Sequence, residues 1–338
     1  MGGGNGQTIH LGFAGDLLVG RKVSRTVVAG QQPEEMWGDL RPRMLATDAM
    51  IANLEAPITT HLIKWHKLKS FYLRADPAVI PSLSAGNIRC VSLANNHILD
   101  FGDQGLLDTR RHLEAAGIAF AGAGANADEA KAPVVFTAGQ ARIGLISITD
   151  NIPAFRATDD RPGTNYWKIS TDAETMARLS GLIDGLRAAG ADLIVLSTHW
   201  GINYRWWPPQ GYRAFARQAI ERGVDIVHGH SAHLFQAVEF HRRGLILYDT
   251  GDFIEDLIVP PGFRSDHSFL FLVDIADGRV ARLRMVPARL TLAKVNTARG
   301  HEAEVIRRAM IKRCRGFAVD IREEVGDLVA TPPGTADG

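Results

Sequence analysis

Residues that could bind a divalent metal ion stand at the ends of several apolar segments of this 338-residue chain. They are Asp16, Glu55, Asn96, His199, His230 and His233. The apolar segments predict buried strands, and strand ends in an α/β sheet share one edge, where residues distant in the sequence converge. Carboxylate, amide and imidazole groups form the mixed oxygen and nitrogen ligand set that Mn, Fe, Zn or Ni accepts. The pattern therefore predicts a metal site at that edge.

Each of these residues also has a purely structural interpretation. Asp16 could cap a following helix, Asn96 could belong to a turn, and His199 could be a hydrogen-bonded histidine at the sheet edge. The two histidines of "GHSAH" are a more specific signal, because both follow a glycine turn and can address one point. Five apolar strands that all end in polar residues of these types favour the metal site over the structural interpretation.

The segments that would position these residues alternate between strand-like and helix-like patterns. Helical spacing closed by a glycine predicts helices over residues 104–117, 172–190 and 208–223. Hairpins are predicted around residues 242–244 and 276–278, so the later half should be more antiparallel. The order of strands and helices predicts a single α/β domain with a mixed sheet.

Two segments between these elements predict loops. Residues 151–168 contain Pro153, Pro162 and Gly163 and indicate a loop or lid. Residues 61–77 carry two histidines and three lysines, and charges in such a loop usually face solvent rather than hold a substrate.

The composition is that of an ordinary soluble globular protein, with 46% hydrophobic and 22% charged residues. A net charge of +1 gives no basic field for binding nucleic acid. The only cysteines, Cys90 and Cys314, do not make a disulfide framework and favour a reducing compartment. No apolar run has the length of a signal sequence or a membrane span, so we expect a cytoplasmic protein. A homo-oligomer is left open.

Five motifs occur in the order found in one known family. They are "GDLLVGR", "NLEAPIT", "NNHILDFG", "HWGINY" and "GHSAHLFQ". Over residues 9–256 the chain resembles the capsule poly-γ-glutamate synthesis (CapA-like) family, a branch of the calcineurin-like metallophosphoesterase superfamily. The resemblance implies a four-layer α/β/β/α sandwich with mixed sheets. It also implies a metallophosphoesterase-like catalytic domain over residues 8–290, and we expect a C-terminal helix and flexible tail over residues 291–338.

The same resemblance implies a role for each motif residue. It makes one or two divalent transition-metal ions the cofactor, held by Asp16, Glu55, Asn96, His199, His230 and His233. Glu55 stands at the position of the usual bridging aspartate, and His233 would bind the second metal. Leu18 stands where the superfamily usually has a histidine, which predicts that one of the two metal sites is weak or empty.

His97 corresponds to the catalytic histidine of the superfamily and would protonate the leaving group as a general acid. Asp100 would orient His97, or alternatively cap the following helix; the sequence favours neither interpretation.

Four residues are candidates for binding the substrate. Arg21 could hold a carboxylate or phosphate with its guanidinium fork, or lie on the surface at a helix start. Tyr204 and Trp206 belong to an aromatic cluster that would wall a pocket or pack beneath a loop. Asp252 stands among further acidic residues, which would repel a polyanion and favour a cationic group.

The ligand pattern predicts a hydrolase that uses metal-activated water. The family resemblance suggests a small-molecule or peptide-like amide as substrate, such as a γ-glutamyl or cyclic amide. Two alternatives stay open: a phosphoesterase, as in the wider superfamily, and a non-catalytic partner in poly-γ-glutamate or capsule synthesis. His97 beside Asn96 counts against the partner role, because a scaffold needs no general acid.

Overall fold

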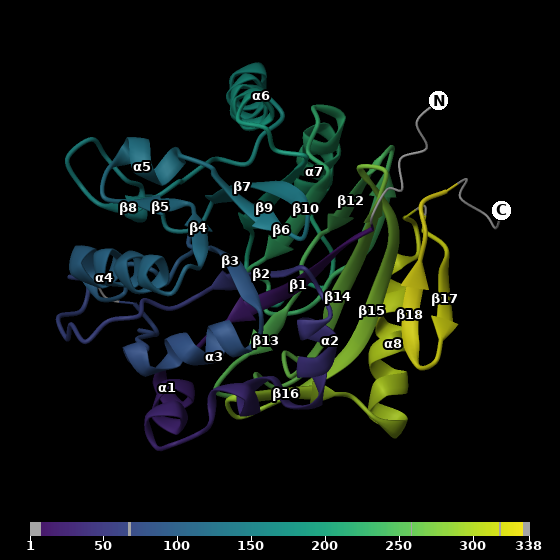
Figure 1. The fold of residues 1–338 in the computed structure, drawn as a ribbon, viewed down its shortest axis with the longest axis horizontal. Coiled ribbons are helices and arrows are strands. Elements are labelled where there is room, and N and C mark those ends of the chain that lie inside the picture. Colours follow the sequence, from purple (N-terminus) through teal and green to yellow (C-terminus); the bar gives the residue numbers. More distant parts are fainter. Residues whose placement is uncertain (1–7, 67–68, 258, 318, 334–338) are drawn as a thin grey trace.

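A large mixed sheet forms the centre of the protein, for which a computed structural model describes residues 8–66, 69–257, 259–317 and 319–333 (Figure 1). In spatial order its strands are β17 (Ile321–Glu324), β18 (Asp327–Ala330), β15 (Arg279–Thr291), β14 (His267–Ala276), β1 (Ile9–Leu17), β2 (Ala49–Leu54), β3 (Ile88–Ser92) and β4 (Ala119–Ala121). Two more strands extend it, β13 (Asp252–Ile254) beside β1 and β16 (Lys294–Thr297) beside β15. The pairs from β1 to β4 are parallel, whereas β14 to β18 pair in antiparallel fashion.

A second sheet has six strands. In spatial order they are β11 (Val238–His241), β12 (Gly244–Leu247), β10 (Ile226–His230), β9 (Leu193–His199), β7 (Ala141–Thr149) and β6 (Val134–Ala138). The four inner strands run parallel, and the two edge strands are antiparallel to their neighbours. A separate pair joins β5 (Ala123–Gly124) and β8 (Gly163–Thr164).

The predicted α/β class with mixed sheets is confirmed, and so are both hairpins, which are β11–β12 and β14–β15. The strands divide between two large sheets, and the strand pattern alone did not show this division. Apolar periodicity identifies a strand but carries no information about which other strand it will pair with.

Helices flank both sheets (Figure 1). They are α1 (Arg21–Val28), α2 (Arg41–Leu45), α3 (Ile80–Ala85), α4 (Gly102–Ala115), α5 (Ala127–Lys131), α6 (Ala173–Ala188), α7 (Gln210–Glu221) and α8 (Gly300–Cys314), with short 3-10 segments η1 (Pro33–Leu40), η2 (Pro77–Val79) and η3 (Pro153–Phe155). The three helices predicted from periodicity are α4, α6 and α7. None of the described helices is long and apolar enough to cross a membrane.

Two apolar clusters hold these elements together. One contains Phe13 of β1, Leu196 of β9 and Phe215 of α7, so side chains of both sheets share a core. The other contains Leu17 of β1 and Leu106 of α4, and it attaches the N-terminal helices to the large sheet. Each fully buried side chain of this size stabilises the fold by about 1.5–3 kcal/mol.

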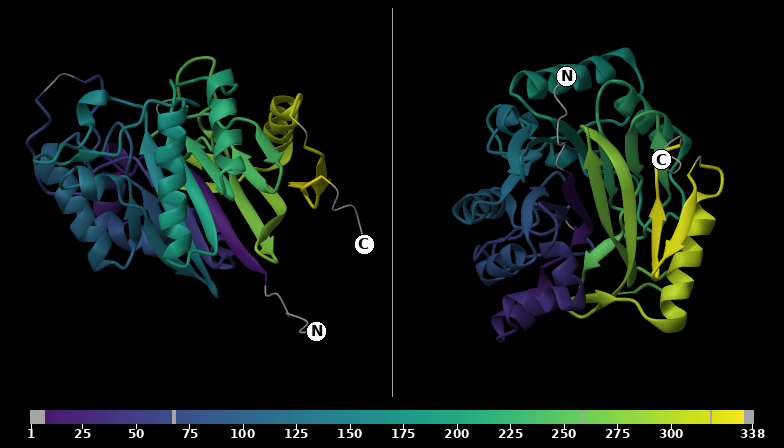
Figure 2. Two further views of the ribbon diagram at one scale, coloured as in Figure 1. Left: turned by 90° about the horizontal axis from the view of Figure 1, so that it is seen from above. Right: turned by 45° about the vertical axis from the view of Figure 1, so that its right-hand side comes forward.

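The C-terminal segment contains more regular structure than a helix and a tail. The expected helix is α8, and Figure 2 shows it beside β17 and β18, in yellow, at one side of the molecule. β18 pairs with β15, a strand that itself crosses residue 290. Residues 334–338, the end of the expected flexible tail, lie outside the described residues. A domain boundary at residue 290 stays a prediction.

The C-terminal end of β1 passes unusually close to the backbone at Gly251. A Cβ atom on Gly15 would lie 1.7 Å from the Gly251 carbonyl oxygen, which also accepts a 2.8 Å hydrogen bond from the Asp16 backbone nitrogen. This approach sets the register in which Asp16 lies opposite Asp252 in β13. Gly15 therefore positions the first of the predicted metal ligands.

We expect Gly15→Ala to lower the free energy of unfolding by about 1–3 kcal/mol or more, because the new methyl group must displace the Gly251 backbone. The matched control is Gly181→Ala in α6, where a Cβ meets no atom within 4 Å and removal of a helical glycine should stabilise the fold. Urea unfolding of both variants measures the two opposite shifts. Equal stability of Gly15→Ala and wild type would contradict the close approach.

Candidate metal centre

The predicted ligands meet where β1 and β2 of the large sheet face β9 and β10 of the small sheet. Asp16 lies near the end of β1, and Glu55 directly follows β2. His199 and His230 are the last residues of β9 and β10, and these two residues are register partners. His233 follows in the turn after β10. All five side chains are buried.

The donor atoms form two groups that share Asp16, and within each group the atoms lie within 4.8 Å of one another. The first joins Asp16 with His199 and His230, whose Nδ1 atoms are 3.0 Å apart and lie 3.9 and 3.7 Å from the Asp16 carboxylate. The Asn96 side-chain oxygen lies 3.0 Å from Nε2 of His199. The second joins Asp16 with Glu55 and His233.

Glu55 is the residue that most directly suggests a bound cation. Both of its carboxylate oxygens are buried and have no hydrogen-bond partner among the described residues. One oxygen lies 3.7 Å from Nε2 of His199 and 3.9 Å from Nε2 of His97. A buried carboxylate without a partner is unfavourable, and a divalent ion would compensate its charge. The donor set, oxygen atoms combined with imidazole nitrogens, fits a divalent transition metal.

Burial changes the protonation of these ligands in the absence of an ion. It raises the pKa of Asp16 to about 7 and, together with the neighbouring Asp16 charge, raises the pKa of Glu55 well above its ordinary value. Burial also lowers the pKa of His199 and of His230 well below their ordinary values. The imidazoles are therefore held in the neutral form that binds metal, while the carboxylates lack a counter-charge.

Asn53 contacts Asp16 and His199 of the first group, although it was not among the six predicted ligands. Its Nδ2 donates a 2.7 Å hydrogen bond to Asp16 and lies 3.2 Å from Nδ1 of His199. Its Oδ1 in turn accepts from Asn95 at 3.2 Å. The only sequence signal was its place at the end of the strand, two residues before Glu55.

His97 is paired with Asp100, as one of the two interpretations predicted. Nδ1 of His97 lies 2.6 Å from the Asp100 carboxylate. The alternative, a helix cap by Asp100, is wrong: Phe101 is the cap residue of α4, and no side chain caps that helix. The Asp100 carboxylate also accepts a 2.6 Å hydrogen bond from the Leu73 backbone.

Lys69 reaches the same carboxylate from the loop between β2 and η2, and its Nζ also donates to the Asn96 carbonyl oxygen. Its side chain is only 10% exposed. The expectation that the charges of residues 61–77 face solvent is therefore wrong for Lys69, while Lys67 lies outside the described residues. No local pattern could show that this lysine meets Asp100, 31 residues later in the chain.

A cavity of about 100 Å³ opens beside the second group. It is lined by Leu18, Gly20, Arg21, Phe71, Leu73, His97, Asn203, Tyr204, His233, Asp252, Glu255 and Asp256. Arg21 pairs with Asp256 at 3.1 Å and lies over the Phe71 ring. Asp252 lies 2.7 Å from Nδ1 of His233, so it orients a predicted ligand as well as lining the cavity.

Of the four predicted substrate residues, Arg21, Tyr204 and Asp252 line this cavity, and Trp206 does not. The Trp206 ring stacks on Phe263 and lies 4.4 Å from the Arg313 guanidinium carbon. The chain turns at Tyr204, which has a φ of 61°, and the direction of the chain after that turn is not visible in the sequence.

Comparison with known proteins agrees with the motifs. The sequence model of the family described as "Bacterial capsule synthesis protein PGA_cap" matches residues 10–257. This chain belongs to that family. The resemblance inferred from the five motifs is thereby confirmed.

Two curated proteins are similar in sequence to this member of the capsule synthesis family. A Mycobacterium tuberculosis protein named "probable polyglutamine synthesis accessory protein" is 32% identical over 298 residues, covering 85% of this chain and 78% of the relative. The "capsule biosynthesis protein CapA" of Bacillus anthracis is 26% identical, covering 84% of this chain and 68% of the relative. A hypothetical protein of Thermus thermophilus with a solved structure is 15% identical and covers 82% of this chain and 98% of its own. Its TM-score of 0.47 is too low to establish a shared fold.

We expect the free energy of unfolding of this protein, stripped of any metal, to fall as the pH rises above about 6.5. Burial raises the pKa of Asp249 to about 8 and of Glu255 to about 9. A carboxyl group whose pKa is higher in the folded than in the unfolded state stabilises the folded protein. This stabilisation is complete below the unfolded-state pKa and is lost as the pH rises through the folded-state pKa. The loss is up to about 1.4 kcal/mol per pH unit for each group.

Buried histidines with a lowered pKa make stability rise with pH, but only below the unfolded histidine pKa of about 6.5. Above that pH the loss of stability from the carboxyl groups is therefore unopposed by the histidines. Urea unfolding across this pH range measures the slope, and Glu255→Gln should make it shallower. Stability that stays constant or increases from about pH 6.5 to about pH 9 would contradict the assignment.

Proposed function

We propose that this protein is a metal-dependent hydrolase that cleaves an amide bond. The observation that carries the proposal is the Glu55 carboxylate, which is buried in the second donor group, has no hydrogen-bond partner among the described residues and lies 3.9 Å from the His97 imidazole. Asp16, Glu55, Asn96, His199, His230 and His233 would hold one or two divalent ions. When bound, such an ion supplies an activated water molecule and polarises the scissile carbonyl group.

His97 would donate the proton that an amine leaving group requires. Its Nδ1 is engaged by Asp100, so Nε2 is the nitrogen that faces the Glu55 carboxylate and the cavity. Asp100 is held in turn by Lys69 and by the Leu73 backbone. These contacts fix the orientation of the imidazole, which an efficient general acid needs.

The cavity supports a neutral or amine-bearing substrate rather than a phosphate. Arg21 is the one cationic side chain among its described lining residues, and the Asp256 carboxylate already pairs with it. Asp252 and Glu255 add two buried acidic groups whose pKa is raised by burial. A phosphoryl group would need cations around its oxygens, whereas an ammonium group beside an amide would favour the ionised form of these two acids.

A non-catalytic role in poly-γ-glutamate or capsule synthesis is the second candidate, and the names of the two curated relatives favour it. The buried His97–Asp100 pair is the feature that favours catalysis instead. We also propose that the elements form a four-layer α/β/β/α sandwich, which the core shared by both sheets supports.

The roles of two histidines should separate under substitution. We expect His230→Ala to lower both metal content and turnover, because the site loses an imidazole ligand. His97→Ala should retain the metal and lower turnover by about a hundredfold or more. Elemental analysis and initial rates measure both effects, with His301→Ala, whose side chain is 89% exposed, as the control. Loss of metal from His97→Ala with unchanged activity per bound ion would overturn the general-acid role.

The reaction class is tested with a substrate panel. In the presence of Mn, Zn, Fe or Ni, γ-glutamyl and cyclic amides should be hydrolysed faster than p-nitrophenyl phosphates. Amides that carry a neighbouring amine should be preferred, and Asp256→Asn should reduce that preference through KM. Faster turnover of the phosphate esters would favour a phosphoesterase, and no turnover in metal-loaded protein would favour the non-catalytic partner.

A further inference from the structure

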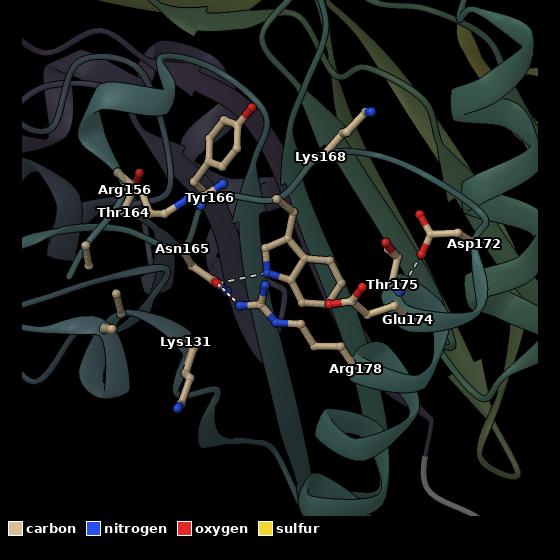
Figure 3. Close-up of a pocket in the computed structure, with 14 residues that line it drawn as sticks. Lys131, Arg156, Thr164, Asn165, Tyr166, Lys168, Asp172, Glu174, Thr175 and Arg178 are labelled. Carbon is tan, nitrogen blue, oxygen red and sulfur yellow. Dashed lines mark hydrogen bonds between the residues drawn. The ribbon is translucent and has the colours of Figure 1, made fainter. Parts of the chain in front are cut away.

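A second cavity, of about 450 Å³, lies beside residues 151–168, the segment predicted as a loop or lid, and contains none of the proposed metal ligands (Figure 3). That volume is in the range of small-molecule sites. Four cationic and two acidic side chains line it: Lys131, Arg156, Lys168, Arg178, Asp172 and Glu174. The lining therefore has an excess of two positive charges, the opposite of the cavity at the metal centre.

Both arginine guanidinium groups are supported by aromatic rings. The Arg178 guanidinium carbon lies 4.1 Å from the centre of the Trp167 ring, and that of Arg156 lies 4.7 Å from the centre of the Tyr166 ring. The Asn165 side-chain oxygen accepts 2.9 Å hydrogen bonds from both Arg178 and the Trp167 indole (Figure 3). Asn165 and Trp167 are buried, and their contacts position the Arg178 guanidinium group.

Neither arginine has a carboxylate partner within the described part of the chain. No described residue forms an ion pair with Arg156 or Arg178, although both face a cavity that contains acidic groups. Burial and the nearby Arg156 charge lower the pKa of Arg178, so the two like charges repel each other. An anion between them would remove this repulsion.

The other charges of the lining are mostly engaged elsewhere. Lys131 pairs with Asp128 at 2.6 Å. The Asp172 carboxylate caps α6 by accepting a 2.8 Å hydrogen bond from the Thr175 backbone nitrogen. With Lys131 paired to Asp128, the cations Arg156, Arg178 and Lys168 still outnumber the acidic Asp172 and Glu174 by one.

We propose that this cavity binds a small dicarboxylate, held by Arg156 and Arg178. A planar guanidinium fork matches the geometry of a carboxylate, and the two forks come from separate elements, the loop after β7 and helix α6. The cavity is also larger than a single phosphate group requires. The same loop begins next to the metal centre, where Asn151 donates a 3.3 Å hydrogen bond to the His199 carbonyl oxygen.

The experiment is calorimetric titration of the metal-stripped full chain with glutarate, its uncharged analogue glutaramide, and inorganic phosphate. Removal of the metal prevents the dicarboxylate from binding to an ion at the other cavity. We expect glutarate to bind with a Kd of about 1 mM or lower and glutaramide not to bind. Arg156→Gln and Arg178→Gln should each weaken glutarate binding by about tenfold or more.

The matched control is Arg308→Gln on α8, which removes the same charge from a 77% exposed side chain and should leave binding unchanged. If Arg178→Gln fails to fold, Lys168→Gln at the same wall replaces it, with a smaller expected loss. Absence of glutarate binding, or equal binding by wild type and Arg156→Gln, would overturn the proposal. Binding of phosphate but not glutarate would overturn the dicarboxylate assignment.

Discussion

The burial of the Asp16 and Glu55 carboxylates at the junction of the two sheets is the constraint on which the site depends. Both groups are withdrawn from water, and Glu55 has no hydrogen-bond donor among the described residues. The junction itself is tight, because His228 of β10 lies 3.1 Å from the Ala14 carbonyl oxygen of β1. Carboxyl groups buried there are neutralised by protonation or by a cation, and with the neutral histidines beside them they could hold a metal ion.

Residues around the ligands hold them in place through the backbone as well as through side chains. Asp249 accepts hydrogen bonds from the Ala232 and Gly251 backbones, so it ties the histidine-bearing turn to the segment that Gly15 approaches. Asn95 binds the Leu54 carbonyl oxygen and fixes the start of the turn that carries His97. The predicted ligands are thus positioned by contacts between segments that are distant in the sequence.

The two cavities differ in the sign of their charge. The cavity at the predicted metal centre is lined by Asp252, Glu255 and Asp256 with one paired arginine. The cavity beside the loop has two arginines that form no ion pair with any described residue. This difference underlies the two proposals, an amide or amine substrate at the first cavity and an anion at the second.

The sequence by itself determined the strands, their polar ends and the family. Asp16, His199 and His230 could be predicted because a polar residue that ends an apolar strand is a local pattern, and parallel strands bring such ends together. The five ordered motifs added the family, since their order is more specific than any one of them.

Only the tertiary structure decided which strands share a sheet, and hence which side chains surround the ligands. Asn53, Lys69 and Asp249 act through partners that are distant in the sequence or through backbone atoms, and no periodicity encodes such pairings. Trp206 lies outside the cavity, and Arg156 lies near Arg178, for the same reason. The direction of a loop depends on long-range packing, which a pattern of neighbouring residues does not contain.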